Sequence, residues 1–473
     1  MGELVYCCLL PHPPVIVPEV GGRDLTAVSA TVEGMKKASK ALVDTTPDTV
    51  LIISPHGPVF RDAVAYLKGQ KLSGSLKDFR APQVEFSFVN DLELIACIEE
   101  EAQAIGIPMV GIDGSSSRWY GVDAVLDHGM MVPLYYLRRA GLPTQVRLVA
   151  LGMSLLGREQ LYRFGVGLRK AIANSPRRVA LVASGDMSHR LIPGAPAGYD
   201  PKGEEFDRII REALQKGDPL PVLKVESHLA ERAGECGLRS LIMALGALDG
   251  LAIKPRVYSY EGPFGVGYLV AELLPQGPDA SRSFLPMLLA SQAESVADIR
   301  ARESPIVRLA RQSLEYYVNH GTKIAASQVP KLPDEFYKRA GAFVSIHTVD
   351  GQLRGCIGTV GPTQKHVVEE VIENAISAGT RDPRFPPVRA EELPYLVYSV
   401  DVLEPPEKVF STDQLDPKRY GIIVRSGLRS GLLLPDLEGV DTVEEQIAIA
   451  KRKAGIGEDE PCELERFEVR RYH

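Results

Sequence analysis

The chain has 473 residues, which is enough for two or three domains. Its residues are 45% hydrophobic, 24% charged and 7% aromatic, a composition that excludes a disordered, collagenous or fibrous chain. The net charge of −7 disfavours a nucleic-acid-binding protein, and six cysteines without a CxxC pair argue against a disulfide framework and a structural zinc knuckle. We therefore expect a cytoplasmic protein that binds no nucleic acid.

The apolar segments are too short to cross a membrane. The run from Leu4 to Leu10 ends at Pro11, and the run at 284–290 is also short. The N-terminus lacks the basic region that opens a secretory signal. We expect no membrane interaction and interpret the first run as a buried strand.

Strand-like and helix-like segments alternate over residues 1–275. Strands are predicted at 5–10, 49–53, 147–153 and 178–184, and helices at 24–43, 91–105 and 158–173. These strands are apolar on both faces, which suits the centre of a sheet that helices cover. The alternation predicts an α/β domain with a central sheet flanked by helices.

A stretch rich in Pro, Gly and Ser, 273–286, marks a change in the character of the chain. We assign 1–275 to a first domain, 276–295 to a linker and 296–473 to a second domain. Beyond the linker, helices are predicted over 304–317 and 363–379, and strands at 342–349, 396–403, 420–427 and 431–435. This pattern predicts a smaller α+β domain.

Three histidines of the first domain come at the ends of predicted strands. His12 follows the first strand, His56 the second and His189 the last. Ligands bind outside the carboxyl ends of strands in open α/β sheets, so these residues can converge although they are distant in sequence. A fourth candidate, His128, lies between a loop and a predicted helix. The pattern favours one shared metal or catalytic site over separate structural histidines.

An anionic ligand is expected beside these histidines. Neutral imidazole is the commonest metal ligand in proteins, and two His with one carboxylate leave positions open for substrate and O₂ in non-haem Fe(II) oxygenases. Glu235 and Cys236 stand together at the start of a predicted helix and can supply the anionic group. The residues themselves leave the choice between the two open.

The second domain contains a candidate reactive thiol in the segment LRGCIGT. Gly355 and Gly358 flank Cys356, which lets the backbone turn tightly and keeps the thiol accessible. Arg354 stands two residues away, on the same face of a strand, where its charge can lower the thiol pKa. The alternative is a buried cysteine in a strand-to-turn transition.

The first domain carries five short motifs in a set order: PHPPVIVPEVG, ISPHGPVF, LDHGMMVPL, SGDMSH and GECGLRSL. This order resembles that of the class III extradiol ring-cleavage dioxygenases of the LigB type, and the related Memo-like proteins share it. The resemblance covers about 1–275. It implies a metal-binding domain that acts with O₂ on a small aromatic or other oxygen-rich substrate.

The resemblance also implies a ligand set. His12 and His56 would hold the metal together with Glu235, whereas Memo-like proteins place a cysteine followed by glycine at this point, which indicates Cys236. Fe(II) is the expected metal, with zinc and copper as alternatives.

Catalytic roles follow from the same resemblance. His189 would be the acid/base residue, with Asp186 beside it as in the Memo-type motif. His128 would face the substrate oxygens.

In the second domain LRGCIGT is followed by DPRFPPV, SVDVL and GLLLP, an order that resembles AMMECR-type domains over about 296–473. This resemblance implies a fold and Cys356 as a candidate catalytic residue, but no reaction. A LigB-type domain joined to an AMMECR-type domain resembles the AmmeMemoRadiSam family. The pairing implies a radical SAM partner protein, and a homodimer is left open.

We expect a two-domain, metal-dependent redox enzyme or enzyme component. One alternative is a non-catalytic scaffold that binds a partner protein at a degenerate metal pocket, since a fold does not fix a function. The other is a metal-dependent hydrolase, which would tolerate zinc and need no O₂.

Overall fold

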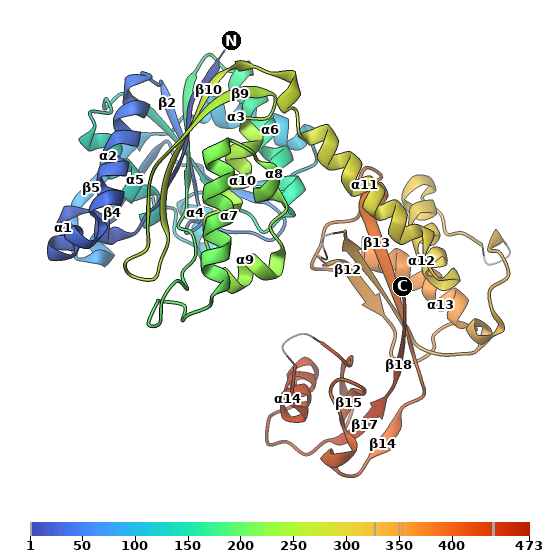
Figure 1. Cartoon of the computed structure of the whole chain (residues 1–473). Coiled ribbons are helices and arrows are strands. Elements are labelled where there is room, and N and C mark those ends of the chain that lie inside the picture. The colour runs from blue at the N-terminus through green and yellow to red at the C-terminus, as the bar shows by residue number, and fades with distance from the viewer. Residues whose placement is uncertain (1, 326–327, 350, 352, 438–439) are drawn as a thin grey trace. The chain divides into compact units, whose positions relative to one another are not determined.

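The computed structural model describes residues 2–325, 328–349, 351, 353–437 and 440–473. The chain divides into two compact units, Met1–Leu289 (unit 1) and Ala290–His473 (unit 2) (Figure 1). Each unit buries apolar side chains of its own.

Unit 1 is built on an eight-stranded sheet in the order β6-β3-β7-β2-β8-β1-β10-β9. The strands are β1 Glu3–Leu10, β2 Thr49–Ser54, β3 Val64–Leu67, β6 Met109–Ile112, β7 Arg147–Gly152, β8 Arg178–Ser184, β9 Leu251–Glu261 and β10 Tyr268–Pro278. The neighbouring strands β7, β2, β8 and β1 are parallel. Their carboxyl ends therefore meet at one edge of the sheet.

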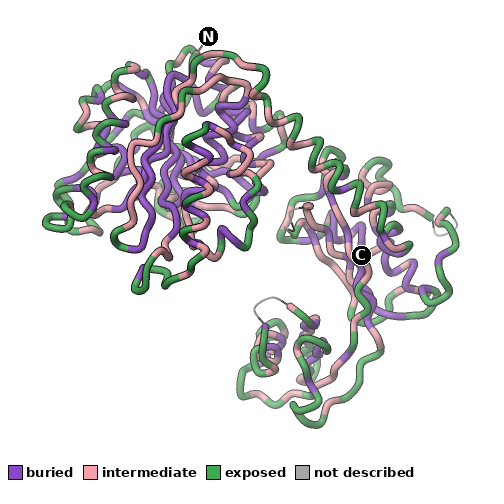
Figure 2. Tube along the Cα trace, in the orientation of Figure 1, coloured by how far each residue is buried: buried purple, intermediate pink, exposed green. Residues whose placement is uncertain are grey.

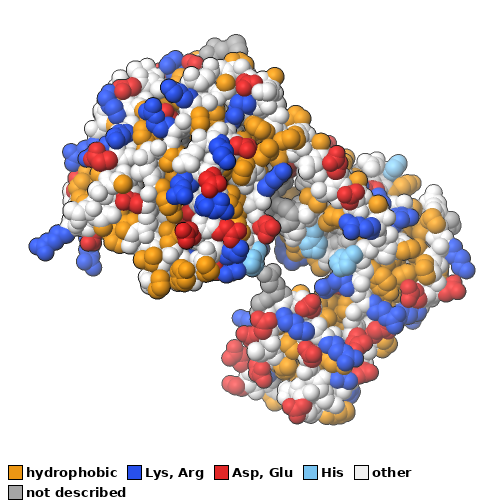
Figure 3. All heavy atoms as spheres, in the orientation of Figure 1, with side chains coloured by type: hydrophobic (Ala, Val, Ile, Leu, Met, Phe, Trp, Pro, Cys, Tyr) orange, Lys and Arg blue, Asp and Glu red, His pale blue; other side chains and the backbone are white. Residues whose placement is uncertain are grey.

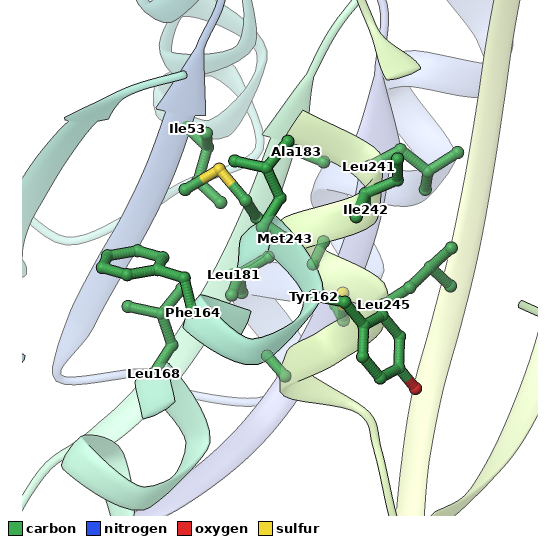
Figure 4. Close-up of a cluster of buried hydrophobic side chains, with 14 of the residues drawn as sticks. Ile53, Tyr162, Phe164, Leu168, Leu181, Ala183, Leu241, Ile242, Met243 and Leu245 are labelled. Carbon is green, nitrogen blue, oxygen red and sulfur yellow. The ribbon is translucent and has the colours of Figure 1, made fainter. Parts of the chain in front are cut away.

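Helices cover both faces of this sheet (Figure 1). One face is packed by α3 (Leu92–Ala104), α6 (Arg158–Asn174) and α10 (Leu238–Ala247), and the other by α2 (Ser29–Asp44) and α5 (His128–Arg139). On the face that α3, α6 and α10 cover, side chains of α6 and α10 pack against Leu181 of β8 (Figure 4). Since both faces are covered, β2 is buried along its whole length (Figure 2).

Further helices and a hairpin complete unit 1. They are the helices α1 (Pro18–Gly21), α4 (Gly114–Tyr120), α7 (Lys202–Lys216), α8 (Leu220–Leu223) and α9 (Ser227–Ala233), and the hairpin β4 (Lys71–Leu76) and β5 (Ala81–Val89). The hairpin lies outside the large sheet.

The predicted α/β fold of the first domain is confirmed, and each element predicted there has a counterpart. The helix predicted from residue 24 begins at Ser29, because Gly22–Val28 forms 3₁₀ turns. The sequence did not predict the hairpin β4–β5 or the strand β9. These strands are partly exposed and contain Gly, Ser or Pro, so they lack the continuous apolar runs that mark the central strands.

Unit 2 contains two four-stranded antiparallel sheets (Figure 1). The first, in the order β12-β11-β13-β18, is formed by β11 Ala342–Thr348, β12 Leu353–Gly358, β13 Leu396–Leu403 and β18 Val469–Tyr472. Helices α12 (Pro305–His320) and α13 (Val367–Thr380) pack on one of its faces.

The second sheet has the order β14-β17-β15-β16 and packs against α14 (Val443–Ala454). Its strands are β14 Glu407–Val409, β15 Gly421–Ser426, β16 Arg429–Leu433 and β17 Glu463–Phe467. The predicted α+β class is confirmed. The helix predicted at 363–379 begins only at Val367, since the backbone at His366 is extended.

The segment predicted as a linker, 276–295, contains regular structure. It holds the end of β10, a 3₁₀ turn at Ala280–Arg282 and the first part of helix α11 (Leu285–Ala301). The division between the units falls inside this helix, after Leu289. Phe284 and Leu285 pack on the core of unit 1, whereas the Arg300 guanidinium donates to carbonyl groups of unit 2.

No helix in the described part of the chain is long and apolar enough to cross a membrane. On the face shown in Figure 3, lysine and arginine side chains are interspersed with aspartate and glutamate.

The end of α11 should stabilise unit 2. A fragment 290–473 keeps the buried Val296 and the bonds of Arg300 to the carbonyls of Leu393 and Leu396, 2.6 and 3.0 Å long. A fragment 302–473 loses both, which should lower its free energy of unfolding by about 2–4 kcal/mol. Thermal denaturation measures the difference, and Arg302→Ala in the longer fragment is the control, since Arg302 is exposed. Equal melting temperatures of the two fragments would contradict this role.

Candidate metal centre

The carboxyl ends of β1, β2 and β8 bring the predicted site residues together. His12 follows β1, His56 follows β2 and Asp186 follows β8, and these three strands are adjacent and parallel. Two groups of potential ligands result, each with its atoms within 4.8 Å of one another. One is His12, His56 and His128, and the other is His12, Asp186 and Cys236.

The ring of His12 is held in one tautomer by a hydrogen-bond chain. Its Nδ1 lies 2.8 Å from Ser184 Oγ, and that hydroxyl donates its proton to the Gly129 carbonyl. Ser184 Oγ must therefore accept a hydrogen bond from the N–H group at His12 Nδ1. The lone pair of His12 Nε2 is left facing the other ligands, the orientation that metal sites obtain from such second partners.

His56 points at the same position as His12. The two Nε2 atoms are 2.9 Å apart. Burial lowers the pKa of His12. Burial and the neighbouring His128 lower the pKa of His56 to about 4. Both rings are thus neutral near pH 7, the form that binds a metal.

Cys236 and Asp186 reach His12 because two loops touch through glycines. A Cβ atom on Gly185 would lie 2.1 Å from the Cα of Gly237, and the Gly237 N–H donates to the Asp186 carbonyl over 3.0 Å. The Cys236 sulfur comes to lie 3.7 Å from His12 Nε2, and an Asp186 carboxylate oxygen 3.9 Å from it. Only glycine at both positions permits this approach.

Burial favours the protonated form of the two acidic groups. It raises the pKa of Asp186 to about 7 and that of the Cys236 thiol well above its ordinary value. A cation would therefore displace protons from this side of the site when it binds.

Glu235, the other predicted third ligand, is not brought into either group. One of its carboxylate oxygens accepts the Leu238 N–H at 2.7 Å, at the start of α10. Burial raises its pKa to about 7. In this structure Glu235 holds the helix start that positions Cys236.

His128 lies on the open side of the centre. Its ring stacks on His56 with centroids 4.2 Å apart, and Phe79 packs 5.2 Å from it. All three residues line a cavity of about 500 Å³. The hairpin β4–β5 and its turn form one wall, which includes Lys77 and Phe79, and sequence reasoning missed this wall because the hairpin carries no strong strand pattern.

His189 lies close to the ligands without joining them. Its backbone N–H donates to the Ala233 carbonyl at 3.1 Å. The Nε2 atom is buried and has no hydrogen-bond partner among the described residues, and burial lowers its pKa. A positive charge on His189 would lower the pKa of His12 and that of His56.

The donor set fits a transition metal. Oriented, neutral imidazole nitrogens and a thiol suit iron, zinc or copper, whereas magnesium and calcium prefer oxygen ligands. Ser184, which orients His12, was not predicted. The available signal was its place as the first residue of the SGDMSH motif, directly before Gly185 and Asp186.

Cys356 belongs to unit 2. One expectation about it is wrong. Gly355 and Gly358 form no turn, because Leu353–Gly358 is one strand, and they make room for the Ala378 carbonyl and the Phe343 ring. The guanidinium of Arg354 pairs with Glu392 at 2.7 Å.

Removing the hydrogen-bond partner of His12 should weaken metal binding. Ser184→Ala leaves Nδ1 without its acceptor, so we expect a loss of about 10–100-fold in metal affinity with the fold retained. Titration of the native protein with Co(II), followed by absorbance, measures it. Ser39→Ala is the matched control, since Ser39 is buried and its hydroxyl has no partner in the described structure. Unchanged affinity in Ser184→Ala would show that this chain does not orient His12.

Comparison with known proteins matches the two units to separate families and the whole chain to a relative. Residues 6–271 match the family described as the catalytic LigB subunit of aromatic ring-opening dioxygenase, and residues 307–473 match AMMECR1. A protein of Clostridium acetobutylicum is 40% identical over 466 residues, which is 98% of this chain and 98% of that protein. A Thermotoga maritima protein is 54% identical over 172 residues, 36% of this chain and 98% of its own length.

The crystal structure of an uncharacterized protein from Pyrococcus horikoshii is 37% identical and covers 35% of this chain and 88% of its own, with a TM-score of 0.33. The two family matches and the relative along the full length identify the chain. It belongs to the LigB family of aromatic ring-opening dioxygenase subunits over residues 6–271, joined to an AMMECR1 domain over 307–473.

Proposed function

We propose that unit 1 is a metal-dependent oxidoreductase that uses O₂ to open the ring of a catechol-like substrate. The observation that carries this proposal is that His56 and Cys236 both approach His12 Nε2, with His56 Nε2 at 2.9 Å and the Cys236 sulfur at 3.7 Å, beside a cavity of about 500 Å³ that His56 lines. Membership of the LigB family supports the reaction class. Cavities of this volume suit small molecules.

His12, His56 and Cys236 would hold the metal, and we propose Fe(II). A thiolate then takes the place of the carboxylate that usually completes such sites, and soft thiolates are accepted by iron. When bound, the ion supplies Lewis acidity and one-electron chemistry with O₂. Asp186 stays beside the sulfur, because its backbone N–H donates to Cys236 Sγ over 3.3 Å.

The cavity walls would hold an aromatic ring next to the centre. Phe79 and Leu126 supply apolar surface, and His56 and His128 supply ring nitrogens that can meet phenolic oxygens. The stacked pair His56–His128 keeps these nitrogens on one side of the cavity. The apolar wall residues would thus contact the aromatic ring of the substrate, and the histidine nitrogens would contact its phenolic oxygens.

His189 is the proposed acid/base residue. Its Nε2 is buried without a partner among the described residues, so a substrate hydroxyl would find an open acceptor there. The lowered pKa keeps the ring neutral near pH 7, and Nε2 is an acceptor in the tautomer that carries its proton on Nδ1. It can take the hydroxyl proton and later return one to a leaving oxygen.

A second candidate is a zinc-dependent hydrolase. The specific observation is that His12, His56 and His128 form a group of their own, and three histidines with one open position are a donor set of catalytic zinc. This reaction would need no O₂. Metal preference and O₂ uptake therefore separate the two candidates.

The test is O₂ uptake by the full chain, purified anaerobically, loaded with Fe(II) and given a panel of catechols. The loaded protein should consume O₂ with at least one catechol. His189→Ala should lower turnover by about 10²–10⁴-fold while the bound iron is unchanged. His228→Ala is the control, because His228 is exposed on α9. If no catechol raises uptake above the metal-free level, and zinc-loaded protein cleaves esters, the hydrolase replaces the oxygenase.

A further inference from the structure

We propose that unit 2 contains a second site, in which Cys356 is the nucleophile and three arginines receive a small anionic molecule that carries an electrophilic carbon. The site is formed by the strand β12 and the segment Asp382–Phe385, which belong to the motifs LRGCIGT and DPRFPPV, together with Arg471 of β18. Neither motif has a part in the function proposed for unit 1.

Cys356 lies on the face of the first sheet that the helices leave uncovered. Val344 and Ile346 of β11 point to the core beneath α12 and α13, so the residue between them, Ser345, points away. Cys356 lies opposite Ser345, which lies opposite Ser399 of β13. The Ser345 hydroxyl donates to the Cys356 sulfur at 3.2 Å.

The backbone of Cys356 is held by an ion pair between the buried Asp382 and the half-exposed Arg384. Its N–H donates to Asp382 at 2.9 Å, and its carbonyl accepts Arg384 Nη2 at 3.2 Å. Asp382 also accepts the Nε and Nη2 groups of Arg384, over 2.9 and 2.7 Å. Asp382 is only 3% exposed, so this arrangement fixes a guanidinium beside the thiol.

Arg354 and Arg471 repeat the geometry of Arg384. Arg354 directs Nε and Nη2 to Glu392, at 2.7 and 3.1 Å, and Arg471 directs them to Asp401, at 2.8 and 3.1 Å. Each of the three arginines thus binds a carboxylate with one edge of its guanidinium, through Nε and Nη2. For none of them is a hydrogen bond from Nη1 found among the described residues, and Nη1 of Arg354 is buried.

Arg384 contacts the Cys356 carbonyl, and Arg471 lies on the first sheet opposite Asp401 of β13. Arg354 and Arg384 both stack on the Phe385 ring, 5.9 and 5.5 Å from its centroid. The pKa of Arg384 is raised mainly by Asp382, and that of Arg471 mainly by Asp401, and the Cys356 sulfur adds to both shifts.

The carboxylates balance most of the charge, so recognition would come from fixed N–H donors. A guanidinium that is held by an ion pair presents its free edge without losing further side-chain entropy. A carboxylate or phosphate group of a small molecule can accept these N–H groups. That places the rest of the molecule near the sulfur of Cys356.

The proposed step needs no oxidant or metal. The thiol loses its proton to solvent, and the sulfur attacks the electrophilic carbon of the bound molecule. The S–C bond forms as the bond from carbon to its leaving group breaks, and the leaving group departs with the electron pair. Cys356 then carries the molecule covalently.

The test compares alkylation of the native full chain by iodoacetate, which is anionic, and by iodoacetamide, which is neutral. Mass spectrometry after digestion gives the rate at each cysteine. The ratio of the iodoacetate rate to the iodoacetamide rate should be about fivefold or more higher at Cys356 than at Cys462, another half-buried thiol. Added NaCl should lower the ratio at Cys356, because salt screens the interaction.

Arg471→Gln should lower the ratio at Cys356 toward that at Cys462. Arg470→Gln is the matched control: it removes the same charge one residue away, but Arg470 lies opposite Val402, on the other face of the sheet. If Arg471→Gln does not fold, the salt dependence of the wild-type ratio decides. A ratio at Cys356 no higher than at Cys462, or one that salt does not lower, would overturn the proposal.

Discussion

The metal centre depends on one backbone contact, where Gly185 after β8 meets Gly237 before α10. A side chain at either position would push the two loops apart and carry Cys236 away from His12. The contact is held from behind, because α10 also approaches α6 closely: a Cβ on Gly246 would lie 2.2 Å from the Tyr162 carbonyl. The packing of two helices on one face of the sheet thus fixes where the thiol lies.

Burial gives this centre its chemical character. It lowers the pKa of His12 and raises that of Asp186 and Cys236, so the group is close to uncharged without a cation. Such a cluster can be kept out of water at modest cost, because no net charge is desolvated. It becomes anionic only when a metal replaces the protons, which links metal binding to proton release.

Sequence reasoning reached the parts of the site that regular structure places. His12, His56 and Asp186 follow strands with continuous apolar runs, and the topology of parallel strands brings such ends together. It could not choose between Glu235 and Cys236, because adjacent residues at a helix start point in different directions, and that depends on the loop contact. The cavity wall from β4–β5 was missed since its strands are half polar.

The same limit applies to unit 2. The spacing in LRGCIGT correctly placed Arg354 and Cys356 in a strand. The two glycines, however, are needed because the Ala378 carbonyl and the Phe343 ring, which come from other segments, pack against them. Likewise, the carboxylate partners of the arginines come from other segments. Long-range contacts of this kind decide what a short motif does, and the motif alone does not contain them.

The most direct test of the central claim is X-ray absorption of the full chain loaded anaerobically with Fe(II). The account predicts imidazole nitrogens and one sulfur in the first shell, with a metal–sulfur distance of about 2.3 Å, and loss of that sulfur in Cys236→Ala. A first shell of nitrogen and oxygen alone in the wild-type protein would contradict it.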